Sequence, residues 1–265
     1  MRKDQFIKFW IAHPAAVSSS GYCDEATALF ARMTALGETP TDARKTAINN
    51  CIVSLKAAGL FATQWDDLVV TKGHAAGSCL LNWILNATNG LAVNSPLFVA
   101  DTGYKKNAAT AYINTKYNLS TESSLFTQND ASWIMKISAA STGAGTKFHG
   151  AVNASAQGVD FCVVTNNRMN GATVIGTGYT NGWNALIRTS STAGSTIINS
   201  TETPFTSNTS AALPSLEPFI FRLNYSTAFD VDTTEVNECY AFGKSLTLVQ
   251  FETFQGIMNT YFATF

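Results

Sequence analysis

Asp230 and Asp232 are two carboxylates at a spacing that could serve chemistry. If this segment is extended, both side chains point to the same face of the strand. A retaining glycosidase uses such a pair, and the same oxygens together with loop carbonyls suit Ca²⁺. The Ser and Thr residues that flank the pair favour a third interpretation, a solvated loop. We therefore expect no catalytic pair here, and Ca²⁺ at Asp230 and Asp232 is the one cofactor that the sequence leaves open.

A second segment has the residue types of a sugar-binding surface. Tyr179, Asn181 and Trp183 bring two aromatic rings and an amide close together around Asn181-Gly182. An exposed ring stacks on the face of a pyranose while amides hydrogen-bond its hydroxyls. The alternative is a core role, because Trp183, Ala185 and Ile187 would share one face of a strand. Both interpretations stay open at this point.

Patterns of nucleophilic catalysis and cofactor binding are missing. The sequence has no G-x-S-x-G elbow, and the glycines of residues 143–147 lack the spacing of a phosphate-binding loop. The 5 cysteines and 3 histidines are far apart and form no CxxC pair, which indicates free thiols in a reducing cytosol and no zinc site. We expect a protein that is not an enzyme.

Composition excludes several classes of partner. Only 13% of the 265 residues are charged, the formal net charge is −1, and 46% are hydrophobic. Without a basic patch the chain is not expected to bind nucleic acid. We expect neither a membrane span nor a signal peptide, because no apolar run is long enough for the one and the first residues lack the apolar run of the other. The many Thr, Ser and Asn residues suit β-strands and turns.

The elements that must position these residues fall into three regions. Residues 1–65 have apolar residues at helical spacing, with helices expected at 3–12, 24–36 and from 42 to about 58, and could anchor the chain or contact another subunit. Residues 66–243 consist of short apolar segments separated by turn residues, which predicts a β-sandwich. Residues 244–265 begin with a capping box, Thr247 to Gln250, and predict a helix that packs on the sandwich.

The predicted strands lie within the middle region and are cut by Gly, Asn, Ser and Thr. Asn181-Gly182 is a strong signal for a tight turn and predicts a hairpin between the segments that flank it. The expected strands are 113–117, 132–138, 159–165, 173–180, 183–189, 196–199, 219–224 and 238–242. This pattern predicts a mainly β fold, a two-sheet antiparallel jelly-roll sandwich with helices at both ends.

Four stretches of the chain resemble a family of bacteriophage structural proteins. They are residues 46–61, 107–120, 182–189 and 237–247, while residues 66–68 and 108–109 depart from the family pattern. In that family a helix precedes a concanavalin A-like, or LamG-like, jelly roll. The resemblance implies a virion component, such as a tail or head fibre, a decoration protein or a baseplate-type protein. Such a protein is made in the bacterial host cytoplasm and assembles in symmetric copies.

The sequence therefore supports three hypotheses of function. The first is a non-enzymatic structural protein of a phage particle, which contacts other virion proteins and copies of itself and could touch glycans of the host surface. The second is a free LamG-like carbohydrate-binding module. The third, a glycan-degrading enzyme, lacks a convincing carboxylate pair.

Overall fold

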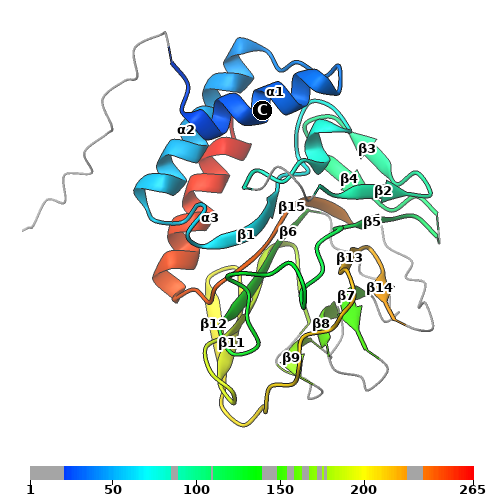
Figure 1. The fold of residues 1–265 in the computed structure, drawn as a ribbon, viewed down its shortest axis with the longest axis vertical. Helices are drawn as coiled ribbons and strands as arrows, with labels where there is room; N and C mark the ends of the chain where they lie inside the picture. The colour runs from blue at the N-terminus through cyan, green and yellow to red at the C-terminus, as the bar shows by residue number, and fades with distance from the viewer. Residues whose placement is uncertain are drawn as a thin grey trace, which may run out of the picture.

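The computed structural model describes residues 21–84, 89–108, 110–138, 148–153, 158–162, 167–171, 175, 178–225 and 235–265. Within these ranges the chain forms helices at its two ends and two β-sheets between them (Figure 1). The expected helix at residues 3–12 and the glycines of 143–147 lie outside the described residues. The helices are α1 (Asp24–Ala35), α2 (Asp42–Ala57), the short 3₁₀ helix η1 (Ser78–Leu80) and α3 (Leu248–Phe262).

Local sequence signals set the ends of these helices. The Thr41 hydroxyl accepts a hydrogen bond from the Arg44 backbone N–H at 3.3 Å and caps the start of α2. Just beyond the end of α2, Gly59 adopts a φ of 69°, which glycine accommodates without strain. Thr247 and Gln250 form the predicted capping box at the start of α3. α1, α2 and α3 therefore form where the sequence predicts them.

The larger sheet has eight strands and extends through the middle of the molecule (Figure 1). Its strand order is β12-β11-β10-β6-β15-β4-β3, and β1 also pairs with β15. Every pairing in it is antiparallel. The strands are β1 (Trp65–Val69), β3 (Leu97–Val99), β4 (Gly103–Lys105), β6 (Ala131–Ser138), β10 (Gly182–Arg188), β11 (Gly194–Ile198), β12 (Thr201–Phe205) and β15 (Val236–Gly243).

The second sheet has seven strands, in the order β2-β5-β13-β7-β8-β9, with β14 pairing to β7. The β14–β7 pairing is parallel and the others are antiparallel. Its strands are β2 (Leu91–Val93), β5 (Tyr112–Asn114), β7 (Phe148–Val152), β8 (Gly158–Cys162), β9 (Arg168–Gly171), β13 (Phe219–Ile220) and β14 (Leu223–Asn224). The mainly β, two-sheet sandwich with helices at both ends is confirmed.

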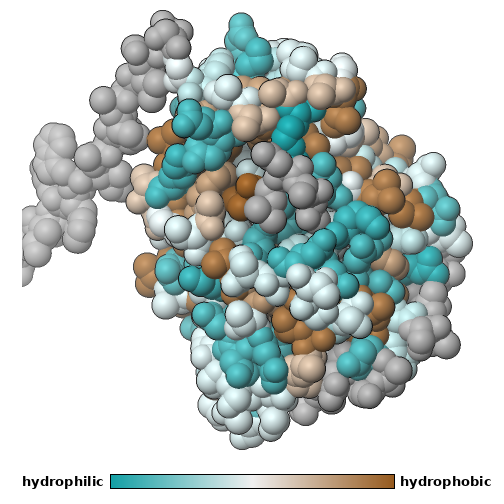
Figure 2. Space-filling model, in the orientation of Figure 1, coloured by the Kyte–Doolittle hydropathy of each residue, from teal (hydrophilic) through white to brown (hydrophobic). Residues whose placement is uncertain are grey.

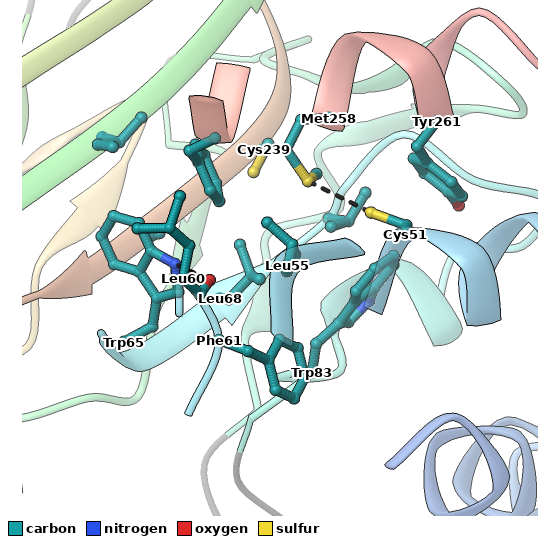
Figure 3. Close-up of a cluster of buried hydrophobic side chains, with 14 of the residues drawn as sticks. Cys51, Leu55, Leu60, Phe61, Trp65, Leu68, Trp83, Cys239, Met258 and Tyr261 are labelled. Carbon is teal, nitrogen blue, oxygen red and sulfur yellow. Dashed lines mark hydrogen bonds between the residues drawn. The ribbon is translucent and has the colours of Figure 1, made fainter. Parts of the chain in front are cut away.

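Two apolar clusters hold the layers together, one on each face of the eight-stranded sheet. Alternation along β6 directs Ile134 toward the helices and Trp133 toward the second sheet. The helix-side cluster joins α2, α3 and β1; in it Cys51 Sγ lies 3.7 Å from Met258 Sδ (Figure 3). In the same cluster Trp65 donates its indole N–H to the Leu60 carbonyl at 3.0 Å. The terminal helices thus share one core with the sheet.

The Asn181-Gly182 hairpin is not present, and this prediction was wrong. β10 begins at Gly182 and has β6 on one side and β11 on the other. Both hydrogen-bonding edges of β10 are therefore occupied, and a hairpin partner from residues 173–180 has no free edge to pair with. Gly182 adopts a φ of 102°, and an added Cβ would lie 2.0 Å from Asn199 Oδ1. The glycine is required for this close approach at the start of β10.

Candidate functional site

The Trp183 ring is packed in the core and offers no face to a ligand. Its side chain is 2% exposed and packs edge-on against Phe254, with Phe262 also beside it. Its indole N–H donates to Asn259 Oδ1 of α3 at 2.9 Å. Trp183 therefore lies in the core, which is the second of the two interpretations of the sequence. The alternation of Trp183, Ala185 and Ile187 along one face of the strand indicated this position.

Tyr179 is also buried, and its hydroxyl is committed inside the protein. The residue is 3% exposed and donates to Glu235 Oε1 at 2.6 Å, while His149 Nε2 lies 3.0 Å from the same hydroxyl. Asn181 is exposed, and its carbonyl accepts from Asn199 Nδ2 at 2.8 Å. The structure therefore does not support the platform of Tyr179, Asn181 and Trp183, because neither ring can stack on a sugar.

The His149, Tyr179 and Glu235 side chains form a closed polar network. His149 Nε2 also lies 3.0 Å from Glu235 Oε2, and its Nδ1 accepts from the Phe221 backbone N–H at 2.9 Å. The accepting Nδ1 assigns the ring proton to Nε2 in the neutral form. His149 and Glu235 have no exposed surface. All three side chains are buried, so the hydrogen bonds among them lie inside the protein.

An open groove lies beside the first turn of α3, where β11 and β12 contribute to its wall. Figure 1 shows where these three elements lie in the fold. Its volume is about 420 Å³, within the range of ligand pockets in proteins. In Figure 2 the surface over β11 and β12 is mostly pale or teal, which marks neutral and hydrophilic residues. The groove is lined by Thr189, Gly194, Ser195, Glu202, Ser245, Leu246, Thr247, Leu248 and Gln250.

Strand register places the groove residues of the sheet on its helix-covered face. Ile197, which packs in the helix-side cluster, pairs with Glu202 across the β11–β12 ladder, and paired residues share a face. Ser195 is two residues before Ile197 and therefore points to the same side. Farther along α3, Gln255 accepts from the Ser200 hydroxyl at 2.9 Å and holds the helix against the β11–β12 turn. The groove opens beside the first turn of this fixed helix.

Four lining side chains keep polar groups that bond to none of the described residues. Ser195 is 4% exposed, and its hydroxyl has no hydrogen-bond partner among the described residues. The same is true of the Ser245 hydroxyl, the Glu202 carboxylate and Gln250 Nε2. Gln250 Oε1, by contrast, accepts from the Thr247 backbone N–H at 2.9 Å within the capping box. Glu202 and Gln250 are exposed and Ser245 is half-buried, so their polar groups face the open groove. The groove thus offers donors and acceptors to a polar ligand.

Sequence reasoning found only one edge of this groove. The capping box marked Thr247 and Gln250 as the start of a helix, but nothing local links them to Ser195 or Glu202. That link depends on the pairing of β11 with β12 and on the packing of α3 across the sheet. Glu202 lies in a strand that the sequence pattern did not predict, because Thr201–Phe205 is exposed and contains Pro204.

The candidate metal site cannot be located. Asp230 and Asp232 lie outside the described residues. In the described ranges no three His, Cys, Asp or Glu side chains come together as a metal site would require. Among the helices in those ranges, none has the length and hydropathy of a membrane span.

Comparison with known proteins gives a likeness of fold. No family model matches the chain, and no curated protein does. A mutant of Trypanosoma rangeli sialidase that displays trans-sialidase activity superposes with a TM-score of 0.52 at 11% identity, over 82% of this chain and 39% of the sialidase chain. The binding domain of botulinum neurotoxin serotype D gives a TM-score of 0.47 at 10% identity, over 74% of this chain and 52% of that chain.

Domain 4 of a GH43 extracellular arabinanase from Geobacillus stearothermophilus, in complex with arabinotriose, gives 0.41 at 16% identity, over 72% of this chain and 98% of that domain. The chain spans 39% of the length of the sialidase. The identities are low throughout, so the sialidase likeness supports the β-sandwich fold and transfers no activity. This chain is therefore a mainly β sandwich.

Proposed function

We propose that this protein is a non-enzymatic glycan-binding β-sandwich whose binding site is the groove between β11, β12 and α3. The observation that carries the proposal is the set of unpartnered polar groups on Ser195, Glu202, Ser245 and Gln250. Sugars present hydroxyls on several sides, and hydroxyl, carboxylate and amide groups bind them through both donated and accepted hydrogen bonds.

The composition of the groove favours a sugar over an apolar ligand. Pockets for most small molecules are lined mainly by apolar and aromatic side chains. Here Leu246 and Leu248 are the large apolar residues, and Leu246 is 3% exposed. A ligand without hydrogen-bonding groups would displace water from the Ser195 and Ser245 hydroxyls without replacing its hydrogen bonds.

The same groove supports binding without hydrolysis. A glycosidase needs two carboxyl groups on either side of the scissile bond. Glu202 is the one carboxylate among the lining residues. The other polar lining groups are hydroxyls and an amide, which do not transfer protons readily at neutral pH.

A glycan array probed with the labelled protein tests the proposal, followed by calorimetry on the sugars that bind. The double variant Ser195→Ala, Ser245→Ala should lose binding at least tenfold, because it removes two free hydroxyls and leaves the capping box intact. Thr203→Ala is the matched control, since Thr203 is exposed on the opposite face of β12. If no array sugar binds above the double variant, or the double variant binds as tightly as the wild type, the groove is not a glycan site.

We further propose that the protein is carried on a bacteriophage particle, with other virion proteins and copies of itself as partners. The resemblance of residues 107–120 and 237–247 to a phage structural family supports this second proposal. A gold-tagged antibody against the chain, applied to intact particles of the source phage, should label one fixed place on the virion. Unlabelled particles, with the protein found free, would leave a separate carbohydrate-binding module.

A further inference from the structure

The groove contains a single charged side chain, and its charge is not balanced. Glu202 makes no ion pair with any described residue, and no Lys, Arg or His lines the groove. The neighbouring chain residue Lys244 is exposed and does not line the groove. A second carboxylate, Asp130, lies behind one wall, where its Oδ1 accepts from the Ser245 backbone N–H at 2.8 Å.

Among the described residues, the only positive charge at the groove is the partial charge at the start of α3. This charge is smaller than the negative charge of Glu202. A helix N-terminus is equivalent to roughly +0.5 of an elementary charge, whereas an ionised carboxylate carries a full negative charge. One of the backbone N–H groups that create this positive charge is already bonded within the cap, because the Gln250 N–H donates to the Thr247 hydroxyl at 3.2 Å. The local field in the groove is therefore negative.

A free carboxylate suits one class of sugar and repels another. An ionised carboxylate is an acceptor only, and its two oxygens can take hydrogen bonds from two adjacent hydroxyls. The Gln250 amide nitrogen can donate to a sugar oxygen, and the Ser195 and Ser245 hydroxyls can do either. A sugar that carries a carboxylate, sulfate or phosphate would bring a like charge to Glu202 and offer it fewer hydroxyl donors.

On the basis of the proposed function, we infer that Glu202 makes the groove selective for neutral glycans with adjacent free hydroxyls and against anionic ones. Glu202 is then a specificity-determining residue. Its selectivity should weaken as salt rises, because the groove is open and exposed charges are screened over about 10 Å at 0.1 M salt.

Pairs of sugars in which a carboxylate replaces the hydroxymethyl group at C6 test this inference. Suitable probes are galactotriose against trigalacturonic acid and mannotriose against trimannuronic acid, added to the neutral and acidic sugars of the array. In low salt the wild type should bind the neutral sugars at least about tenfold more tightly than their acidic counterparts. Glu202→Gln should bring the two classes to within about threefold of each other.

Glu252→Gln is the control, because it removes the same charge from an exposed position of α3 outside the groove and should leave the selectivity unchanged. Acidic sugars that bind the wild type as tightly as neutral ones, or selectivity that survives Glu202→Gln, would overturn the inference while the groove remains a glycan site. Absence of any sugar binding above the Ser195→Ala, Ser245→Ala background would instead overturn the proposed function itself.

Discussion

Replacing Asp67 with Asn should stabilise the protein at neutral pH and change how its stability depends on pH. Asp67 lies in β1 with no exposed surface, and neither of its carboxylate oxygens has a hydrogen-bond partner among the described residues. Burial raises the pKa of this carboxyl well above its usual range, and the nearby charges of Asp66 and Glu122 raise it further. In the folded protein the group therefore keeps its proton at pH values where it loses it in the unfolded chain.

The sign and size of the effect follow from this difference. Below pH of about 3.9 both states are protonated and Asp67 makes no pH-dependent contribution. Above it the unfolded carboxyl ionises and the folded one does not, so the free energy of unfolding falls by about 1.4 kcal/mol per pH unit up to the folded pKa.

Asp67→Asn has no such loss, because an amide does not ionise. Urea unfolding at pH 4, 5, 6 and 7 should give a variant that is equal to or slightly less stable than the wild type at pH 4. The variant should then gain about 1.4 kcal/mol per pH unit over the wild type as the pH rises. Asp160, whose pKa burial raises to about 7 beside Arg168, is present in both proteins, so its contribution cancels in the difference.

The neighbouring Asp66 provides the control. Its carboxylate accepts hydrogen bonds from the backbone N–H groups of Ser124, Leu125 and Phe126, at 2.7 Å in the case of Phe126. Asp66→Asn should destabilise the protein at pH 7, by about 1.5–3 kcal/mol, because it weakens charge-assisted bonds to buried donors. A stability difference between Asp67→Asn and the wild type that stays constant from pH 5 to pH 7 would refute the reasoning.

Three further predictions test the buried core and the cap of α3. Tyr179→Phe should lower the free energy of unfolding by about 1–3 kcal/mol, measured in urea, because it removes one of the hydrogen bonds donated to the buried Glu235 carboxylate. Trp183→Ala should cost about 3–5 kcal/mol in the same assay, and an unchanged stability would remove Trp183 from the core. Thr247→Ala should lower the thermal midpoint through a capping loss of about 1 kcal/mol, and Thr253→Ala on the exposed face of α3 should not.

Local signals in the sequence predicted most of the secondary structure, and non-local pairing explains what they missed. The capping box fixed the start of α3 because both of its residues lie within one turn. Asn181-Gly182 was misleading because the same dipeptide can form a tight turn or let the backbone lie close to another side chain, here Asn199. The pairing of β10 with β6 and β11 decides between the two, and this pairing is not visible in the local sequence. The buried network of His149, Tyr179 and Glu235 joins residues up to 86 positions apart, which no local pattern reveals.

The charge of Glu202 could instead serve to protect the exposed edge of the sheet. β12 is the edge strand of its sheet, and natural proteins often place charges on exposed edges to prevent pairing with another chain. Pro204 already disrupts this edge, because proline has no N–H to donate to an added strand. Glu202 also faces the side of the sheet that α3 covers, among hydroxyls with no protein partner. The glycan site proposed above accounts, in addition, for the position of Glu202 beside the Ser195 and Ser245 hydroxyls.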